Sequence, residues 1–159
     1  MNDEKIEHLI KRYRNLFEKK GLDSKKLHLI EDKLELVLPD DFKQISKVFD
    51  GYEEIAGQSF FSFDPDVKGW NVVEKTLFYR KSSCFLPRNF LALREESESF
   101  VVMETKDDPK LNTSIIECSL SDANNLIDMK FYDNPTIFPS FTDFFEYLIE
   151  QEEKDRQQK

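Results

Sequence analysis

The chain has 159 residues, of which 39% are hydrophobic and 13% aromatic, and its formal net charge is −9. This length suits one hydrophobic core and is short for two, so a single domain over residues 1–159 is expected. An acidic chain lacks the excess of Lys and Arg that phosphate neutralisation needs, which argues against nucleic acid as a partner. The same charge would suit a basic protein partner, or would simply keep the surface soluble.

Helical periodicity marks the start of the chain. Apolar residues at three- and four-residue steps predict an amino-terminal helix over residues 3–20. Its outer face is basic, and we interpret it as solvated in preference to binding an anionic surface. The basic residues are Lys11, Arg12, Arg14, Lys19 and Lys20.

The densest local signals lie in residues 27–51. A second apolar stripe, which includes Leu27 and Leu34, predicts a helix that runs into Pro39 and must end there. Pro39 and the acids after it are typical of the first turn of another helix, where carboxylates favour the positive end of the helix dipole. Gly51 then suits a left-handed stop. This region therefore predicts two helices joined at a proline corner.

Residues 52–132 predict a sheet region interrupted by one helix. Two short strands are expected within residues 52–66, and a helix over residues 70–80 in which Trp70 is a core anchor. Short apolar runs with polar breaks then indicate antiparallel strands joined as a meander. These strands are expected at residues 90–93, 100–103, 114–118 and 128–132.

The carboxyl-terminal part returns to helical periodicity. Ser140 and Asp143 form a capping-box signal, and aromatic residues supply the buried stripe of a helix over residues 140–156. The predicted fold class is therefore α+β: an antiparallel-rich sheet of about six strands, flanked by amino-terminal helices and a carboxyl-terminal helix.

The pattern around the proline corner resembles the SUKH superfamily, which contains the yeast Smi/Knr cell-wall regulators and many bacterial immunity proteins. The family signature places an aliphatic residue, Glu and Leu before Leu-Pro-x-Asp-aromatic, and then Asn-Gly-Gly. The matching residues are Leu27, Glu31, Leu34, Leu38, Pro39, Asp41, Phe42 and Gly51. Tyr52 departs from the pattern, since it replaces the usual second glycine. The Pro87-led strands and the aromatic helix at the end also resemble the family, so the resemblance runs from residue 27 to residue 149.

Signals for catalysis or a bound cofactor are lacking. His8 and His28 have no Cys or His at ligand spacing, and Cys84 and Cys118 lie outside any Cys-x-x-Cys pattern, so no metal site is expected and the thiols should be reduced. Nucleophile and phosphate-loop motifs are absent, and acidic pairs such as those at residues 107–108 suit solvated turns. We therefore predict a protein that is not an enzyme and has no cofactor.

The charged first residues lack a secretory pattern, and no run of about 18 apolar residues is present, so a cytoplasmic protein without membrane contact is expected. Two functions remain open. The resemblance to bacterial members implies an immunity protein, monomeric when free, that binds and neutralises a cognate toxin, for instance a nuclease. The alternative is a Smi/Knr-like regulatory scaffold in cell-wall synthesis or signalling, although the long extensions of yeast members are absent from this chain.

A partner-binding site is predicted from the segregation of charge. Residues 50–66 hold five acids and no base, and residues 94–108 hold six acids and two bases. If these segments meet, they form a negative patch with apolar anchors, which would steer a basic partner. The predicted partner-binding residues are Tyr52, Glu53, Glu54, Phe61, Phe63, Asp64, Asp66, Glu95 and Glu96. The plainer interpretation is that these acids only keep the surface soluble.

Overall fold

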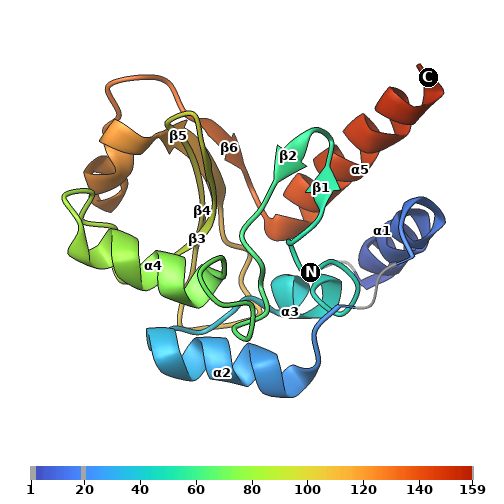
Figure 1. Ribbon diagram of the computed structural model, residues 1–159, viewed down its shortest axis with the longest axis horizontal. Coiled ribbons are helices and arrows are strands. Elements are labelled where there is room, and N and C mark those ends of the chain that lie inside the picture. The colour runs from blue at the N-terminus through green and yellow to red at the C-terminus, as the bar shows by residue number, and fades with distance from the viewer. Residues whose placement is uncertain (1–2, 19–20, 159) are drawn as a thin grey trace.

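The computed structural model describes residues 3–18 and 21–158 (Figure 1). Its helices are α1 (Asp3–Leu16), α2 (Ser24–Leu34), α3 (Asp40–Ile45), α4 (Val72–Lys81), the 3-10 helix η1 (Leu120–Ile127) and α5 (Phe141–Gln157). Its strands are β1 (Glu54–Ile55), β2 (Gln58–Ser59), β3 (Phe90–Glu96), β4 (Ser99–Glu104), β5 (Ile115–Ser119) and β6 (Thr136–Phe138). The α+β fold class predicted from the sequence is confirmed.

The strands form two antiparallel sheets. The larger sheet has the order β3-β4-β5-β6, which is the predicted meander, and the smaller one is the β1–β2 hairpin. The chain that follows β2 lies along the outer edge of β3, since the Phe61 N–H donates to the Leu93 carbonyl at 2.9 Å. The opposite edge is β6, a strand of three residues that lies between Pro135 and Pro139. The sheet therefore has one covered edge and one short, open edge.

The helices pack around this sheet in two groups. Helix α4 packs against β3 and α2 packs against α4, whereas α1, α3 and α5 pack against one another on the other side of the molecule (Figure 1). An aromatic cluster fills the space among the second group. Phe49 lies at its centre, with ring centroids 5.8 Å from Tyr13, 5.5 Å from Phe63 and 5.7 Å from Phe145. Edge-to-face and offset pairs of this kind stabilise a core beyond the area they bury.

Three of the helices have a side-chain N-cap. Asp23 accepts the Lys26 N–H at the start of α2, Asn71 accepts the Glu74 N–H at the start of α4, and Ser140 accepts the Asp143 N–H at the start of α5. The Ser140 hydroxyl also donates to the Asp143 carboxylate, so the predicted capping box forms. Each cap satisfies a backbone N–H that has no partner within its own helix.

Two helix boundaries predicted from the sequence are wrong. Helix α1 ends at Leu16 and not at residue 20, and residues 19 and 20 lie outside the described part of the chain. Helix α2 ends at Leu34 instead of running into Pro39, because Glu35 adopts a left-handed conformation (φ 54°) and its N–H donates to the Glu31 carbonyl. The residues between α2 and Pro39 are extended, and the alternation of an extended segment buries Leu36 and Leu38.

Two further predictions in the middle of the chain are wrong. Residues 128–132 form no strand; a loop follows η1 there, and the last strand is β6. The apolar residues of this segment imitate strand alternation but lie on a loop closed by a buried carboxylate, Asp122. Trp70 is not a buried anchor, since 39% of it is exposed; its indole N–H donates to the Phe60 carbonyl and its ring packs against Phe61.

Candidate protein-binding surface

The Glu31 side chain stabilises the corner before Pro39. Its carboxylate accepts the Leu38 N–H at 2.8 Å and lies 3.3 Å from Lys43 Nζ. Leu38 lies beyond the end of α2 at Leu34, so its N–H has no acceptor within the helix, and the Glu31 carboxylate supplies one. The Glu of the family signature therefore holds the extended segment against the end of its own helix.

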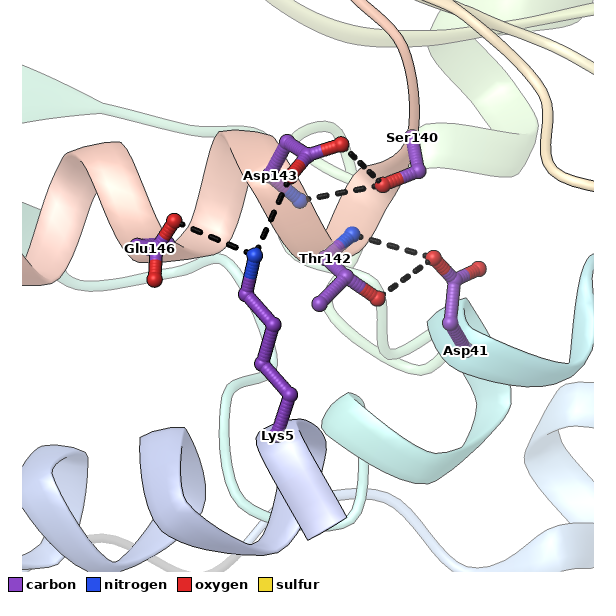
Figure 2. A network of polar contacts seen from close by, with 6 residues as sticks. All are labelled: Lys5, Asp41, Ser140, Thr142, Asp143 and Glu146. Atoms are coloured by element: carbon purple, nitrogen blue, oxygen red, sulfur yellow. Dashed lines mark hydrogen bonds and ion pairs between the residues drawn. The ribbon is translucent and has the colours of Figure 1, made fainter. Parts of the chain in front are cut away.

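Asp41 joins two distant parts of the chain. It lies in the first turn of α3 and is buried, with an exposed fraction of 1%. Figure 2 shows its carboxylate directed at the first turn of α5, where it accepts the N–H of Thr142 at 3.0 Å and its hydroxyl at 2.8 Å. A carboxylate suits this position because unpaired N–H groups and the helix dipole both favour negative charge.

A cation from α1 reaches the same helix end. Lys5 Nζ lies 3.3 Å from Asp143 and 3.2 Å from Glu146, both in the early turns of α5 (Figure 2). These side chains are about one-third exposed, so the ion pairs are worth little individually. Together with Asp41 they place α1 and α3 on the start of α5.

Gly51 occupies a position that only glycine fits. Its φ is +83°, in the left-handed region, and a Cβ built there would lie 2.5 Å from the Phe61 carbonyl oxygen and 2.6 Å from the Phe63 ring. The backbone must therefore pass close to the following segment. Like Glu31 and Asp41, this signature residue contributes to the fold; Gly51 and Asp41 are buried, and the Glu31 side chain is 16% exposed.

Two of the predicted partner-binding residues are buried. Phe61 is 1% exposed and Phe63 is 0% exposed, so the prediction that they are surface anchors is wrong. The sequence predicted a strand with one open face, but this segment is covered on both sides. Phe63 packs against Phe42 at 5.0 Å between ring centroids, and Phe61 lies against β3 through its backbone.

The first acidic segment is largely engaged within the protein. Glu53 accepts the Tyr13 hydroxyl at 3.1 Å, and burial, reinforced by the Glu53 charge, raises the pKa of Tyr13. Lys26 Nζ lies 2.6 Å from Asp64 and 3.6 Å from Asp66. Tyr52 and Glu54 are exposed, with 55% of Tyr52 accessible. A role of this segment in partner binding stays a prediction.

The second acidic segment lies at the turn between β3 and β4. Glu96 pairs with Arg94, which is almost fully buried, and Glu95 is partly exposed. The turn residues Ser97 and Glu98 both have positive φ, 51° and 70°, as a two-residue hairpin turn requires. The Glu98 carbonyl accepts the Leu120 N–H at 2.6 Å, so this turn lies beside the start of η1.

Sequence reasoning missed a set of exposed apolar residues around η1. They lie on the loop after α4 and on the segment that ends and follows η1, which Figure 1 shows in orange on the opposite side of the view from α1 and α5. They are Phe85 (67% exposed), Ile127 (78%), Met129 (42%) and Tyr132 (82%). The turn-forming pair Asn134–Pro135 was the available signal that the segment after η1 is a loop.

Two of the hollows formed by the described residues bear on ligand binding. One of about 370 Å³ lies between the loop after α4 and η1, and is lined by Ser83, Cys84, Glu98, Leu120, Ser121 and Asn124. The larger, of about 630 Å³, lies between α1 and α3, and acids such as Glu4 and Glu7 share its wall with Lys11 and Arg14. Because both acids and bases line the larger hollow, it shows no clear preference for a ligand of either charge.

Within residues 3–18 and 21–158, no group of three or more His, Cys, Asp or Glu side chains is arranged to hold a metal ion. No helix in this part of the chain combines the length and the apolar character needed to cross a membrane. Burial raises the pKa of Cys118 to about 12, and the nearby carboxylates Asp122 and Glu117 add to the shift, so this thiol is protonated at neutral pH.

These features define a small α+β domain that contains an antiparallel meander and a helical corner, and in which the buried Asp41 joins that corner to the carboxyl-terminal helix α5. The chain belongs to the SMI1 / KNR4 family (SUKH-1), whose family model matches residues 21–147. The match covers the proline corner, both sheets, η1 and the first turns of α5. Members of this family are generally non-catalytic and typically bind protein partners. The search among curated proteins found no match.

Proposed function

We propose that this protein is an immunity protein that binds a cognate bacterial toxin and neutralises it by occupying its surface. The observation that carries the proposal is the family match over residues 21–147, because immunity proteins are common among Smi/Knr-like domains. The role needs no catalytic residue, no metal and no cofactor. It requires one stable domain, monomeric in the absence of the toxin, that acts in the cytoplasm of the cell it protects.

The charge of the chain supports a basic target. A net charge of −9 produces a negative field that accelerates encounter with a positively charged protein and slows encounter with nucleic acid. A nuclease toxin carries such a positive surface, because it must itself bind phosphates. An acidic inhibitor can therefore compete for the same surface that the toxin uses for its substrate.

The proposal is tested with the product of the adjacent reading frame. Its carboxyl-terminal domain is expressed in a sensitive host, with and without this chain, and an inactivated form of it is purified for calorimetry. We expect co-expression to restore growth and the two purified proteins to form a one-to-one complex. Toxicity that persists, together with no heat of binding, would remove the immunity role. A gene whose neighbours synthesise the cell wall would instead support the regulatory scaffold.

A further inference from the structure

We infer that the partner docks on the exposed apolar and acidic surface around η1, and that it presents a basic surface there. This "η1 surface" comprises the apolar residues Phe85, Ile127, Met129 and Tyr132 and the acids Glu96, Glu98, Asp128 and Asp133. The inference rests on the proposed function, since it names the face by which a toxin would be held.

Apolar exposure singles out this part of the molecule. Among the residues that the structure describes, the three most exposed large hydrophobic side chains are Tyr132, Ile127 and Phe85. All three belong to the η1 surface. Scattered exposed hydrophobic residues are ordinary, but a concentration of them next to polar residues is typical of a protein interface. Aromatic and aliphatic side chains of this kind supply the buried anchors of such interfaces.

The backbone at this surface is held in disfavoured conformations. The described part of the chain has six residues other than glycine with positive φ, and two of them are Phe85 (49°) and Met129 (58°); Ser97 (51°) and Glu98 (70°), in the adjoining hairpin, have the positive φ of a two-residue turn. Bulky side chains such as Phe and Met rarely adopt this region. Phe85 and Met129 are exposed, so burial of their own side chains does not offset this strain.

A buried carboxylate keeps the loop of the η1 surface in one shape. Asp122 is 0% exposed, and it accepts the N–H of Tyr132 at 2.9 Å, the N–H of Asp133 at 3.3 Å and the side-chain amide of Asn125 at 2.8 Å. The Met129 N–H also donates to the Asn125 carbonyl at 2.8 Å. A loop ordered in this way before binding loses little conformational entropy when a partner docks.

Charge decides which partner fits. Residues 82–89, 94–98 and 120–134, which form and adjoin the η1 surface, contain six acids and three bases; the buried Arg94 pairs with Glu96, and of the acids only Asp122 is fully buried. A second copy of the chain would bring acids against acids, which opposes association, whereas a basic protein would neutralise them. The open edge at β6 is a poorer docking site, because a strand of three residues bounded by prolines offers few backbone groups.

The test compares two matched double variants in binding to the inactivated domain encoded by the adjacent reading frame. Ile127→Ser with Tyr132→Ser removes two anchors of the η1 surface. Tyr52→Ser with Leu111→Ser removes two apolar side chains exposed elsewhere, and Tyr52 belongs to the site predicted from sequence. We expect the first variant to raise Kd about 100-fold and the second to change it less than about threefold. Urea melts of both variants confirm that they fold.

A charge variant tests the chemistry of the partner. Glu98→Gln, Asp128→Asn and Asp133→Asn together should slow association about tenfold at low salt, and the difference should shrink at 0.5 M salt, where charges are screened within about 3 to 5 Å. An unchanged association rate at low salt would exclude a basic partner on this face.

The remaining outcomes separate this inference from the proposed function. A complex that the Ile127/Tyr132 variant leaves intact would overturn the η1 surface while the immunity role stands. A complex weakened by the Tyr52/Leu111 variant alone would place the partner at the sequence-predicted site. Light scattering that shows a dimer of the free protein, abolished by the Ile127/Tyr132 variant, would assign the surface to a second copy. No complex with the unaltered chain would overturn both proposals.

Discussion

The proline corner, residues 27–51, and the η1 surface each contain a buried aspartate that accepts backbone N–H groups. Asp41 in the corner binds Thr142, which is 101 residues away in the chain, and so joins α3 to α5. Asp122 binds N–H groups 10 and 11 residues away, and so closes a loop. The first carboxylate secures the whole fold and the second secures the shape of one surface segment. Changes at the corner should therefore lower global stability, whereas changes around η1 should act mainly on the loop and on binding.

The largest expected effect is at the core of the corner. Phe42 is fully buried, and its ring lies 5.0 Å from Phe63 and 4.9 Å from Phe141 between centroids. Phe42→Ala should lower the free energy of unfolding by about 3 to 5 kcal/mol, measured by urea denaturation. Phe78→Ala, at a side chain 62% exposed, is the matched control and should change it by less than about 0.5 kcal/mol. Equal losses at the two positions would contradict the assignment of the core.

The next effect is at the contact between Asp41 and Thr142. Asp41→Ala leaves the Thr142 N–H and hydroxyl buried without an acceptor, which should cost about 2 to 3 kcal/mol in urea melts. Thr142→Val removes only the hydroxyl and should cost about 1 kcal/mol. An Asp41→Ala loss no larger than that of Thr142→Val would show that the bond to the helix N–H contributes little.

Two glycines in the same conformation give a smaller contrast. Gly51 (φ +83°) has no room for a Cβ, whereas Gly57 (φ +72°) has open space around it. Gly57→Ala should cost about 1 kcal/mol from backbone strain alone. Gly51→Ala should cost about 1 kcal/mol more, because the Phe61 backbone and the Phe63 ring must move. Thermal melts of the two variants side by side measure the difference. Identical melting temperatures would mean that the residues around Gly51 accommodate the added Cβ at little cost.

The smallest expected effect is a pH-dependent loss of stability in the variant Asp122→Asn. The hydrogen bond from the Tyr132 N–H, with further bonds from Asn125 and Asp133, holds the pKa of Asp122 below its ordinary value. A carboxyl with a depressed pKa in the folded state stabilises the fold above its unfolded pKa, near 4, and this contribution is lost as pH falls through the folded value. Asp122→Asn should therefore unfold at lower urea than the unaltered protein at pH 7, and the gap should close towards pH 2. A gap of constant size would exclude the ionised carboxylate as its source.

Much of the corner could be predicted because its signals are local. Leu27 and Leu34 follow helical spacing, and Pro39 sets a boundary through its own geometry. The exact end of α2 could not be predicted, since it depends on the left-handed Glu35 and on the bond from Leu38 to Glu31. The Asp41 contact with Thr142 has no local signal at all, because it forms only when α5 reaches α3.

The candidate site was predicted less well, for a different physical reason. Phe61 and Phe63 alternate as on a half-exposed strand, but the aromatic cluster and β3 cover both of their faces. Met129 and Phe131 alternate in the same way and lie on a loop. Alternation reports where apolar residues stand along the chain, not whether a neighbouring element covers them. Of the predicted residues, Glu96 lies on the η1 surface, and Tyr52 and Glu54 keep their exposure elsewhere.

The prolines on either side of β6 bear on how the protein behaves when it is abundant. At high protein concentration an open sheet edge invites chain-to-chain strand addition and fibril growth. Pro135 and Pro139 have no N–H to donate, so a foreign strand could pair with only the three residues between them. Exposed Ile137 therefore lies on an edge that offers few backbone groups to a foreign strand, which lowers the tendency of this edge to seed a polymer.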